Sequence, residues 1–159
     1  MKNKVKFSIY AQVITAAVII LCIIGEISLW DIPEKLVKFN LITGVAIIAG
    51  LYYCPISVEA NQSEIKLYRL LGRPRIFTYR DIQSVDTCYP SAGGIRLCGS
   101  GGLFGYWGYF SDIMIGTYFG YYGSRSYCFL VKLKNGKQYV LGCENPVAMV
   151  EYIESNMEK

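Results

Sequence analysis

Residues 7–25, FSIYAQVITAAVIILCIIG, and residues 39–58, FNLITGVAIIAGLYYCPISV, carry no charged side chain and are separated only by a short loop. Each stretch is about long enough to cross the hydrocarbon core of a bilayer as a helix. Outside lipid, either stretch would expose a large apolar surface to water. The sequence therefore predicts a transmembrane hairpin over residues 1–55, with spans at about 8–28 and 37–54, followed by one domain over residues 56–159.

Composition agrees with a membrane segment joined to a small domain. Apolar residues make up 53% of the chain and charged residues only 18%, below the usual quarter. The roughly one hundred residues after the spans suffice for a single compact domain. From Lys66 onward the basic residues are nearly matched by Asp and Glu, so the net charge of +4 is no sign of a nucleic-acid partner.

The chain contains no histidine and no CxxC pair. The absence of histidine excludes Ser/His/Asp and Cys/His catalysis, histidine-ligated metals and histidine pH switches. The cysteine spacing shows neither a zinc knuckle nor a redox pair, so no metal, cofactor or catalytic residue is predicted. We expect reduced, buried thiols, with a disulfide framework as the alternative for four cysteines of the domain: Cys88, Cys98, Cys128 and Cys143.

Flanking charges predict the orientation of the hairpin. Lys2, Lys4 and Lys6 precede the first span, and five more basic residues follow the second. By the positive-inside rule both termini should be cytoplasmic, in a multi-pass protein of the inner cell membrane. A cleaved signal peptide is the alternative, but residues 25–28 offer no small-residue cleavage site and a second apolar run follows at once.

Two uncharged polar residues, Gln12 and Thr15, lie within the first span. They could mark a pathway through the membrane or form hydrogen bonds across the helix pair. Because neither is ionisable, the second interpretation is favoured.

From Ile56 onward the pattern indicates strands, with Ile56, Val58 and Ala60 expected on one face. The dipeptide Asn135-Gly136 predicts a tight hairpin. After it, Asn145 and Pro146 predict the start of a helix whose apolar face carries four residues: Val147, Val150, Ile153 and Met157. The fold class predicted is a mainly-β barrel of about seven antiparallel strands, capped by this C-terminal helix.

Glycine and aromatic residues alternate over residues 93–122. A nucleotide-binding loop is disfavoured, because no helix pattern follows and the GK[ST] ending is missing. Disorder is disfavoured because too many apolar side chains would face water, so strands and turns are expected. Six rings in this stretch are candidate exposed anchors for a partner, with filling of the barrel interior as the alternative: Tyr106, Trp107, Tyr109, Tyr118, Tyr121 and Tyr122.

Within this stretch, residues 96–110 (RLCGSGGLFGYWGYF) resemble the glycine-rich signature of a bacterial pleckstrin-homology-like (PH) domain family. Residues 142–146 (GCENP) look similar as well, and the resemblance covers roughly residues 56–156. It implies a PH-like barrel placed after two membrane spans. It supplies no catalytic or ligand-binding residue.

Three functions are compatible with these features. The first is a membrane-anchored binding or scaffold module that presents a cytoplasmic β-barrel to a protein partner or to a second copy. The second is sensing of anionic lipid or a headgroup by five basic residues behind the second span, although flanking charge and solvated strand faces explain them more simply: Lys66, Arg69, Arg73, Arg75 and Arg80. The third, a small membrane enzyme, is disfavoured because its only candidate groups lack partners by spacing; besides the cysteines these are Asp81, Asp86, Asp112 and Glu144.

Overall fold

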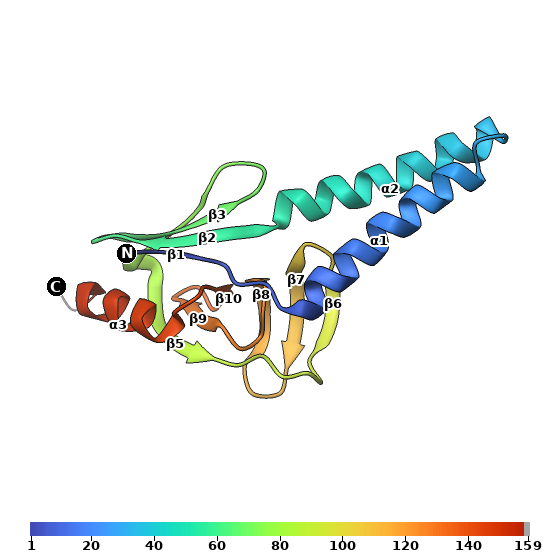
Figure 1. The fold of residues 1–159 in the computed structure, drawn as a ribbon. Helices are drawn as coiled ribbons and strands as arrows, with labels where there is room; N and C mark the ends of the chain where they lie inside the picture. Colours follow the sequence, from blue (N-terminus) through green and yellow to red (C-terminus); the bar gives the residue numbers. More distant parts are fainter. Residues whose placement is uncertain (158–159) are drawn as a thin grey trace.

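The two apolar stretches form helices α1 (Ile9–Ser28) and α2 (Pro33–Tyr53) in the computed structural model, which describes residues 1–157. Both helices are long and apolar enough to cross a membrane. They run side by side away from the rest of the molecule (Figure 1). The helix α2 begins earlier than predicted because Pro33 suits the first helical position and Lys38 pairs with Glu34 one turn away.

The first sheet joins the N-terminus to the segment that follows α2. Its strands lie in the order β1-β2-β3-β4, and they are β1 (Lys2–Lys4), β2 (Pro55–Ala60), β3 (Glu64–Arg69) and β4 (Arg75–Thr78). The sequence did not predict β1, because its lysines were interpreted only as flanking charge. Since β1 pairs antiparallel with β2, the N-terminus and the β-region lie at the same end of the helix pair (Figure 1).

A register shift in β2 corrects one detail of the predicted hairpin. Val58 and Ala60 are fully buried, but Ile56 is 40% exposed. The pairing with β3 is irregular between Pro55 and Ser57, so Ile56 leaves the alternation that would have placed it on the inner face.

The second sheet contains the glycine–aromatic stretch. After a short 3-10 turn, η1 (Tyr79–Asp81), its strands are β5 (Ile82–Cys88), β6 (Ile95–Gly102), β7 (Gly105–Asp112), β8 (Gly116–Tyr122), β9 (Cys128–Leu133) and β10 (Gln138–Gly142). Their order is β5-β9-β10-β8-β7-β6, and β10 pairs with β8 in parallel.

The described residues therefore form ten strands in two sheets, instead of about seven antiparallel strands in a closed barrel. The glycine–aromatic stretch explains the difference. It adds the meander β6-β7-β8 to the edge of β10, and this parallel pairing depends on a contact between distant segments that sequence periodicity does not contain.

The predicted hairpin and C-terminal helix are confirmed. Gly136 adopts a φ of 81° in the turn between β9 and β10, and its N–H donates to the Leu133 carbonyl. The helix α3 (Pro146–Met157) is capped by Asn145, whose side chain accepts from Ala148 N. Its buried residues Met149 and Ile153 join one core with residues of both sheets, whereas Val147, predicted on that face, is 49% exposed.

Candidate anion-binding pockets

Three of the five basic residues behind the second span gather in one pocket. Arg69, Arg73 and Arg75 line a cavity of about 490 Å³ together with Tyr52 and Tyr53 at the end of α2, and with Pro74, Ile76 and Tyr121. The turn between β3 and β4 positions these arginines, because Arg69 ends β3 and Arg75 begins β4. This turn lies beside the end of α2 (Figure 1).

The arginine side chains are held by aromatic rings and backbone. The Arg69 guanidinium lies 4.5 Å from the centre of the Tyr52 ring, and its Nη2 donates to the Arg73 carbonyl over 2.8 Å. Arg75 donates to the hydroxyls of Tyr121 (3.2 Å) and Tyr139 (2.6 Å). Burial raises the pKa of Tyr121 although the bond from Arg75 lowers it, so the phenol stays neutral and brings no negative charge to the pocket.

Positive charge in this pocket has no compensation from a carboxylate. None of the ion pairs among residues 1–157 includes Arg69, Arg73 or Arg75. Arg73 is exposed, and Nε of Arg69 is buried without a hydrogen-bond partner. Such an arrangement favours an anion, because a guanidinium fork matches phosphate or carboxylate oxygens.

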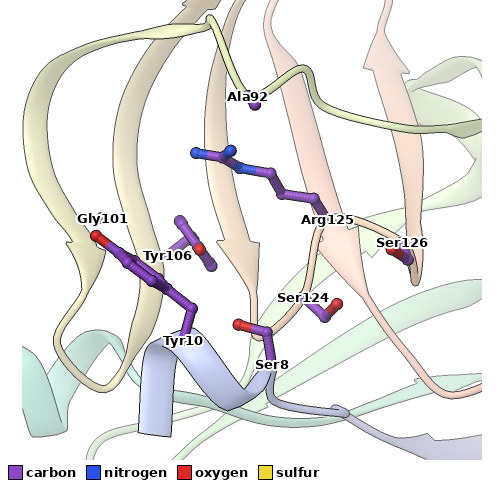
Figure 2. Close-up of a pocket in the computed structure, with 8 residues that line it drawn as sticks. All are labelled: Ser8, Tyr10, Ala92, Gly101, Tyr106, Ser124, Arg125 and Ser126. Atoms are coloured by element: carbon purple, nitrogen blue, oxygen red, sulfur yellow. The ribbon is translucent and has the colours of Figure 1, made fainter. Parts of the chain in front are cut away.

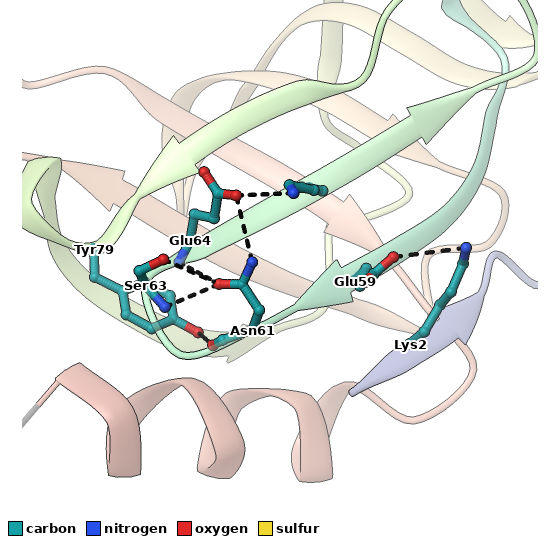
Figure 3. A network of polar contacts seen from close by, with 7 residues as sticks. Lys2, Glu59, Asn61, Ser63, Glu64 and Tyr79 are labelled. Carbon is teal, nitrogen blue, oxygen red and sulfur yellow. Dashed lines mark hydrogen bonds and ion pairs between the residues drawn. The ribbon is translucent and has the colours of Figure 1, made fainter.

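The other two basic residues lie elsewhere. Lys66 pairs with Glu64 at 2.9 Å, and this carboxylate also accepts from Asn61 (Figure 3). The bond and charge of Lys66 lower the pKa of Glu64, and the same pair raises the pKa of Lys66. Arg80 lines a separate cavity with residues of α3. The five basic residues thus divide into a cluster of three arginines, one lysine that is neutralised by Glu64, and one arginine in a separate cavity.

The predicted exposure of the aromatic anchors is wrong for four of the six. Tyr106, Tyr118, Tyr121 and Tyr122 are at most 5% exposed and belong to the core. Trp107 is partly buried and stacks on Tyr53, with ring centres 5.0 Å apart. Only Tyr109, at 52%, is largely exposed. Glycines leave room for one of these rings, since a Cβ on Gly120 or Gly142 would come within 2.8 Å of Tyr122, so most of the predicted anchors belong to the core.

A second pocket was not foreseen from the sequence. It occupies about 490 Å³ at the start of α1 and is lined by Ser8, Tyr10, Ala92, Gly101, Tyr106, Ser124, Arg125 and Ser126 (Figure 2). The loop between β8 and β9 supplies Arg125, whose guanidinium lies 5.1 Å from the centre of the Tyr106 ring. The only sequence signal was an arginine between two serines, which is too common a pattern to indicate a site.

The candidate catalytic carboxylates have structural positions. Both oxygens of Asp112 accept backbone N–H bonds, from Ser91 at 2.8 Å and from Met114 at 2.9 Å. Burial acts to raise the pKa of Asp112, but these hydrogen bonds outweigh it and hold the pKa below its usual value. Asp81 ends the η1 turn, and Asp86 and Glu144 are exposed.

All six cysteines are free, as expected for reduced thiols. Cys88, Cys128 and Cys143 are buried, but Cys98 is exposed on β6, contrary to the prediction. Burial raises the pKa of Cys88 to about 12 and that of Cys143 to about 11, which keeps both thiols protonated and poorly nucleophilic. Within residues 1–157, no group of three or more Cys, Asp or Glu side chains is placed to hold a metal ion.

Comparison of the chain with protein-family models, with curated proteins and with solved structures finds no match.

Proposed function

We propose that this protein is a membrane-anchored module that binds anionic lipid headgroups at the membrane surface. The observation that carries the proposal is the cluster of Arg69, Arg73 and Arg75, which has no carboxylate partner among residues 1–157 and lies beside the end of the apolar helix α2. If α2 crosses the membrane, this pocket lies at the level of the lipid phosphates.

The turn between β3 and β4 has the composition of a segment that touches lipid. Leu70 and Leu71 are 48% and 44% exposed, and they lie between Arg69 and Arg73. Exposed leucines beside arginines suit the boundary between headgroups and acyl chains, because the leucines can contact the acyl chains while the arginines contact the headgroups and water. Tyr52 adds an amphipathic ring at the same place.

The proposal also includes a PH-like domain, both termini on one side of the membrane, and a cytoplasmic orientation. Two sheets followed by a C-terminal helix support a PH-like domain, although the described residues form no closed barrel. Pairing of β1 with β2 supports an arrangement with both termini on one side of the membrane. The lysines before α1 and the arginines after α2 favour the cytoplasmic side of the cell membrane.

Lipid competition on the purified full chain tests the proposal. The chain is held in an uncharged detergent and offered equal amounts of phosphatidylglycerol and phosphatidylcholine, and native mass spectrometry counts the lipids bound. Preference for phosphatidylglycerol is expected. The double variant R69Q/R73Q should weaken its binding by about 2 kcal/mol, or about thirtyfold, at roughly 1 kcal/mol per basic residue.

The variant R80Q is the matched control, because it removes the same charge from a different cavity. Equal binding of the two lipids by the unmodified chain contradicts the proposal. So does an R80Q effect as large as that of R69Q/R73Q, since it would indicate an effect of net charge alone.

A second candidate function is association with a protein partner or with another copy. It is favoured by β6, which forms one edge of the second sheet and exposes Ile95 (67%) and Leu97 (59%) beside Tyr109 of β7. Unpaired edge strands with apolar side chains are templates for strand addition.

Chemical crosslinking in native membranes tests this candidate, using the exposed Cys98 of β6 as the reactive group. Discrete adducts are expected, and Leu97→Lys should abolish them by placing a charge on the edge. A chain that forms no adduct in its native membrane excludes this edge as an interface.

A further inference from the structure

The cavity at the start of α1 holds a cation without a partner. Arg125 makes no ion pair and no hydrogen bond among residues 1–157, and its Nε is buried. The neighbouring ring of Tyr106 orients the guanidinium without neutralising it. Removing part of a charged group from water is costly unless a group of opposite charge compensates. An arginine in this state indicates a site for an anion.

Hydroxyl groups surround the same cavity. Ser8, Ser124 and Ser126 line it, and the ring of Tyr10 closes one side (Figure 2). Ser124 is only 9% exposed, and its backbone carbonyl accepts from the Cys128 thiol at 3.0 Å, which fixes this residue in the cavity wall. The Ser8 hydroxyl accepts from Ala11 N at 3.2 Å, which leaves its own proton free to be donated. Hydroxyl donors of this kind match the oxygens of a phosphate.

The position of Ser8 adds the start of a long helix. Ser8 caps α1, a helix of 20 residues, and satisfies one of the N–H groups of its first turn. The remaining first-turn N–H groups have no acceptor inside the helix. Because the N-terminal end of a helix carries a partial positive charge, it favours an anion at this place.

Size and surroundings narrow the class of ligand. A volume of about 490 Å³ lies in the range of roughly 300–1,000 Å³ that is usual for small-molecule sites, so the cavity exceeds the needs of a single ion. A second guanidinium, that of Arg96, lies beside Gly101 of the cavity wall. The distance from its Nη1 to the position that a Cβ on Gly101 would take is 3.3 Å. Among the residues that the structure describes, no Asp or Glu side chain lines the cavity.

We infer that this cavity is a second binding site, separate from the pocket of Arg69, Arg73 and Arg75, and that it takes a small molecule carrying a phosphate monoester. Arg125 pairs with the phosphate, and Ser8, Ser124 and Ser126 donate hydrogen bonds to it. The site lies where α1 begins, so the phosphate belongs either to the headgroup of a lipid or to a soluble phosphate ester.

Calorimetric titration of the full chain in an uncharged detergent tests the inference. The soluble probe is glycerol 3-phosphate, and the lipid probe is short-chain phosphatidic acid. Binding of at least one probe is expected, and R125Q should weaken that binding at least tenfold. Because a cavity variant might destabilise the fold, the milder Ser124→Ala is measured as well and should weaken binding about threefold to tenfold with an unchanged melting temperature.

The outcomes separate the two sources and the two sites. Binding of both probes assigns the site to phosphate esters in general, and binding of phosphatidic acid alone assigns it to a lipid headgroup. The variant R73Q should bind the probe as tightly as the unmodified chain, because Arg73 lies in the other pocket and not in the cavity of Arg125. The inference is overturned if neither probe binds, or if R125Q and Ser124→Ala bind as tightly as the unmodified chain. Failure of the lipid competition at Arg69 and Arg73 leaves this result unaffected.

Discussion

Single residues with unusual surroundings determine how this chain forms its turns. Asp112 lies at the end of β7, where it is 5% exposed and joins the turn after β7 to the loop at Ser91. A charged acceptor bonded to backbone N–H groups contributes more than a neutral one. The carboxylate therefore stabilises the fold at this turn.

The variant D112N should be less stable than the unmodified chain at pH 7, by about 1–2 kcal/mol, and this difference should shrink in acid. The pKa of Asp112 is depressed in the folded state, so its contribution is complete above the unfolded-state pKa of about 3.9 and is lost as pH falls through the lower folded value. Melting temperatures of the full chain in detergent at pH 7 and pH 3 measure the effect.

The exposed Asp86, which bonds only the Ser84 hydroxyl, provides the control. The variant D86N should change stability little at either pH. A D112N difference that stays constant between pH 7 and pH 3 would contradict the assignment.

Two contacts between elements depend on particular residue types: the pairing of β6 with β7 depends on glycine, and the contact of α1 with the β6–β7 turn depends on threonine. In the hairpin β6–β7, Gly99 and Gly108 are opposite one another, with φ of 116° and 117°. A Cβ on either glycine would overlap the backbone of the other strand. In the turn of the same hairpin, the Thr15 hydroxyl of α1 accepts from Phe104 N at 2.9 Å, and its single proton is shared between the Ala11 carbonyl at 2.7 Å and the Gly102 carbonyl at 3.2 Å.

Gly108→Ala should lower the free energy of unfolding by roughly 2 kcal/mol or more, because the new methyl group meets the Cys98 carbonyl and the backbone conformation disfavours any Cβ. Thermal unfolding of the full chain measures this loss. Gly93→Ala is the matched control, since nothing lies within 4 Å of its Cβ position, and it should be nearly neutral. Equal melting temperatures for the two variants would exclude the close approach.

Thr15→Val should loosen the β6–β7 turn from α1 without unfolding either element. Loss of the bond that Phe104 N donates to the Thr15 hydroxyl, worth about 1 kcal/mol, should speed amide exchange at Phe104 roughly fivefold. Hydrogen–deuterium exchange of the peptide that contains residues 103–105 measures this rate.

Thr43→Val is the control for that experiment, because Thr43 bonds only carbonyls of its own helix, those of Phe39 and Asn40. It should leave exchange at Phe104 unchanged. If Thr15→Val also leaves it unchanged, the turn is held by packing of Phe104 alone.

At the scale of the whole molecule, the hairpin and the two sheets form one unit with a defined polarity. The turn between α1 and α2 lies at one end, and both sheets, the N-terminus and α3 lie at the other (Figure 1). Both proposed anion pockets lie near the ends of the helices that face the sheets. A membrane around α1 and α2 would therefore bring lipid phosphates close to both.

Labelling of single cysteines in intact cells should show this polarity. In a chain whose native cysteines are replaced, Trp30→Cys in the helix connection should react with an impermeant reagent. Lys134→Cys in the β9–β10 turn should react only after permeabilisation. Labelling at Lys134→Cys alone would invert the orientation and place both pockets outside the cell.

Local pattern was sufficient for the parts of this protein that depend on near neighbours in the chain. Uncharged runs of sufficient length determined the two helices, Asn135-Gly136 the last hairpin, and Asn145-Pro146 the start of α3. In each case a few adjacent residues determine the backbone angles of a turn or the free energy of transferring an apolar segment from water to lipid. The sequence alone is therefore enough to predict these elements.

Contacts between distant segments decided the rest. The parallel pairing of β8 with β10, the strand β1 and the burial of four tyrosines all depend on which surfaces meet in three dimensions. The same holds for the sites, because similar spacing did not distinguish Arg73 from Arg80. Arg125 became notable only when folding placed it beside Ser8, in a cavity that no carboxylate of residues 1–157 lines. Charge compensation acts through space, so only the tertiary structure could separate a paired cation from a free one.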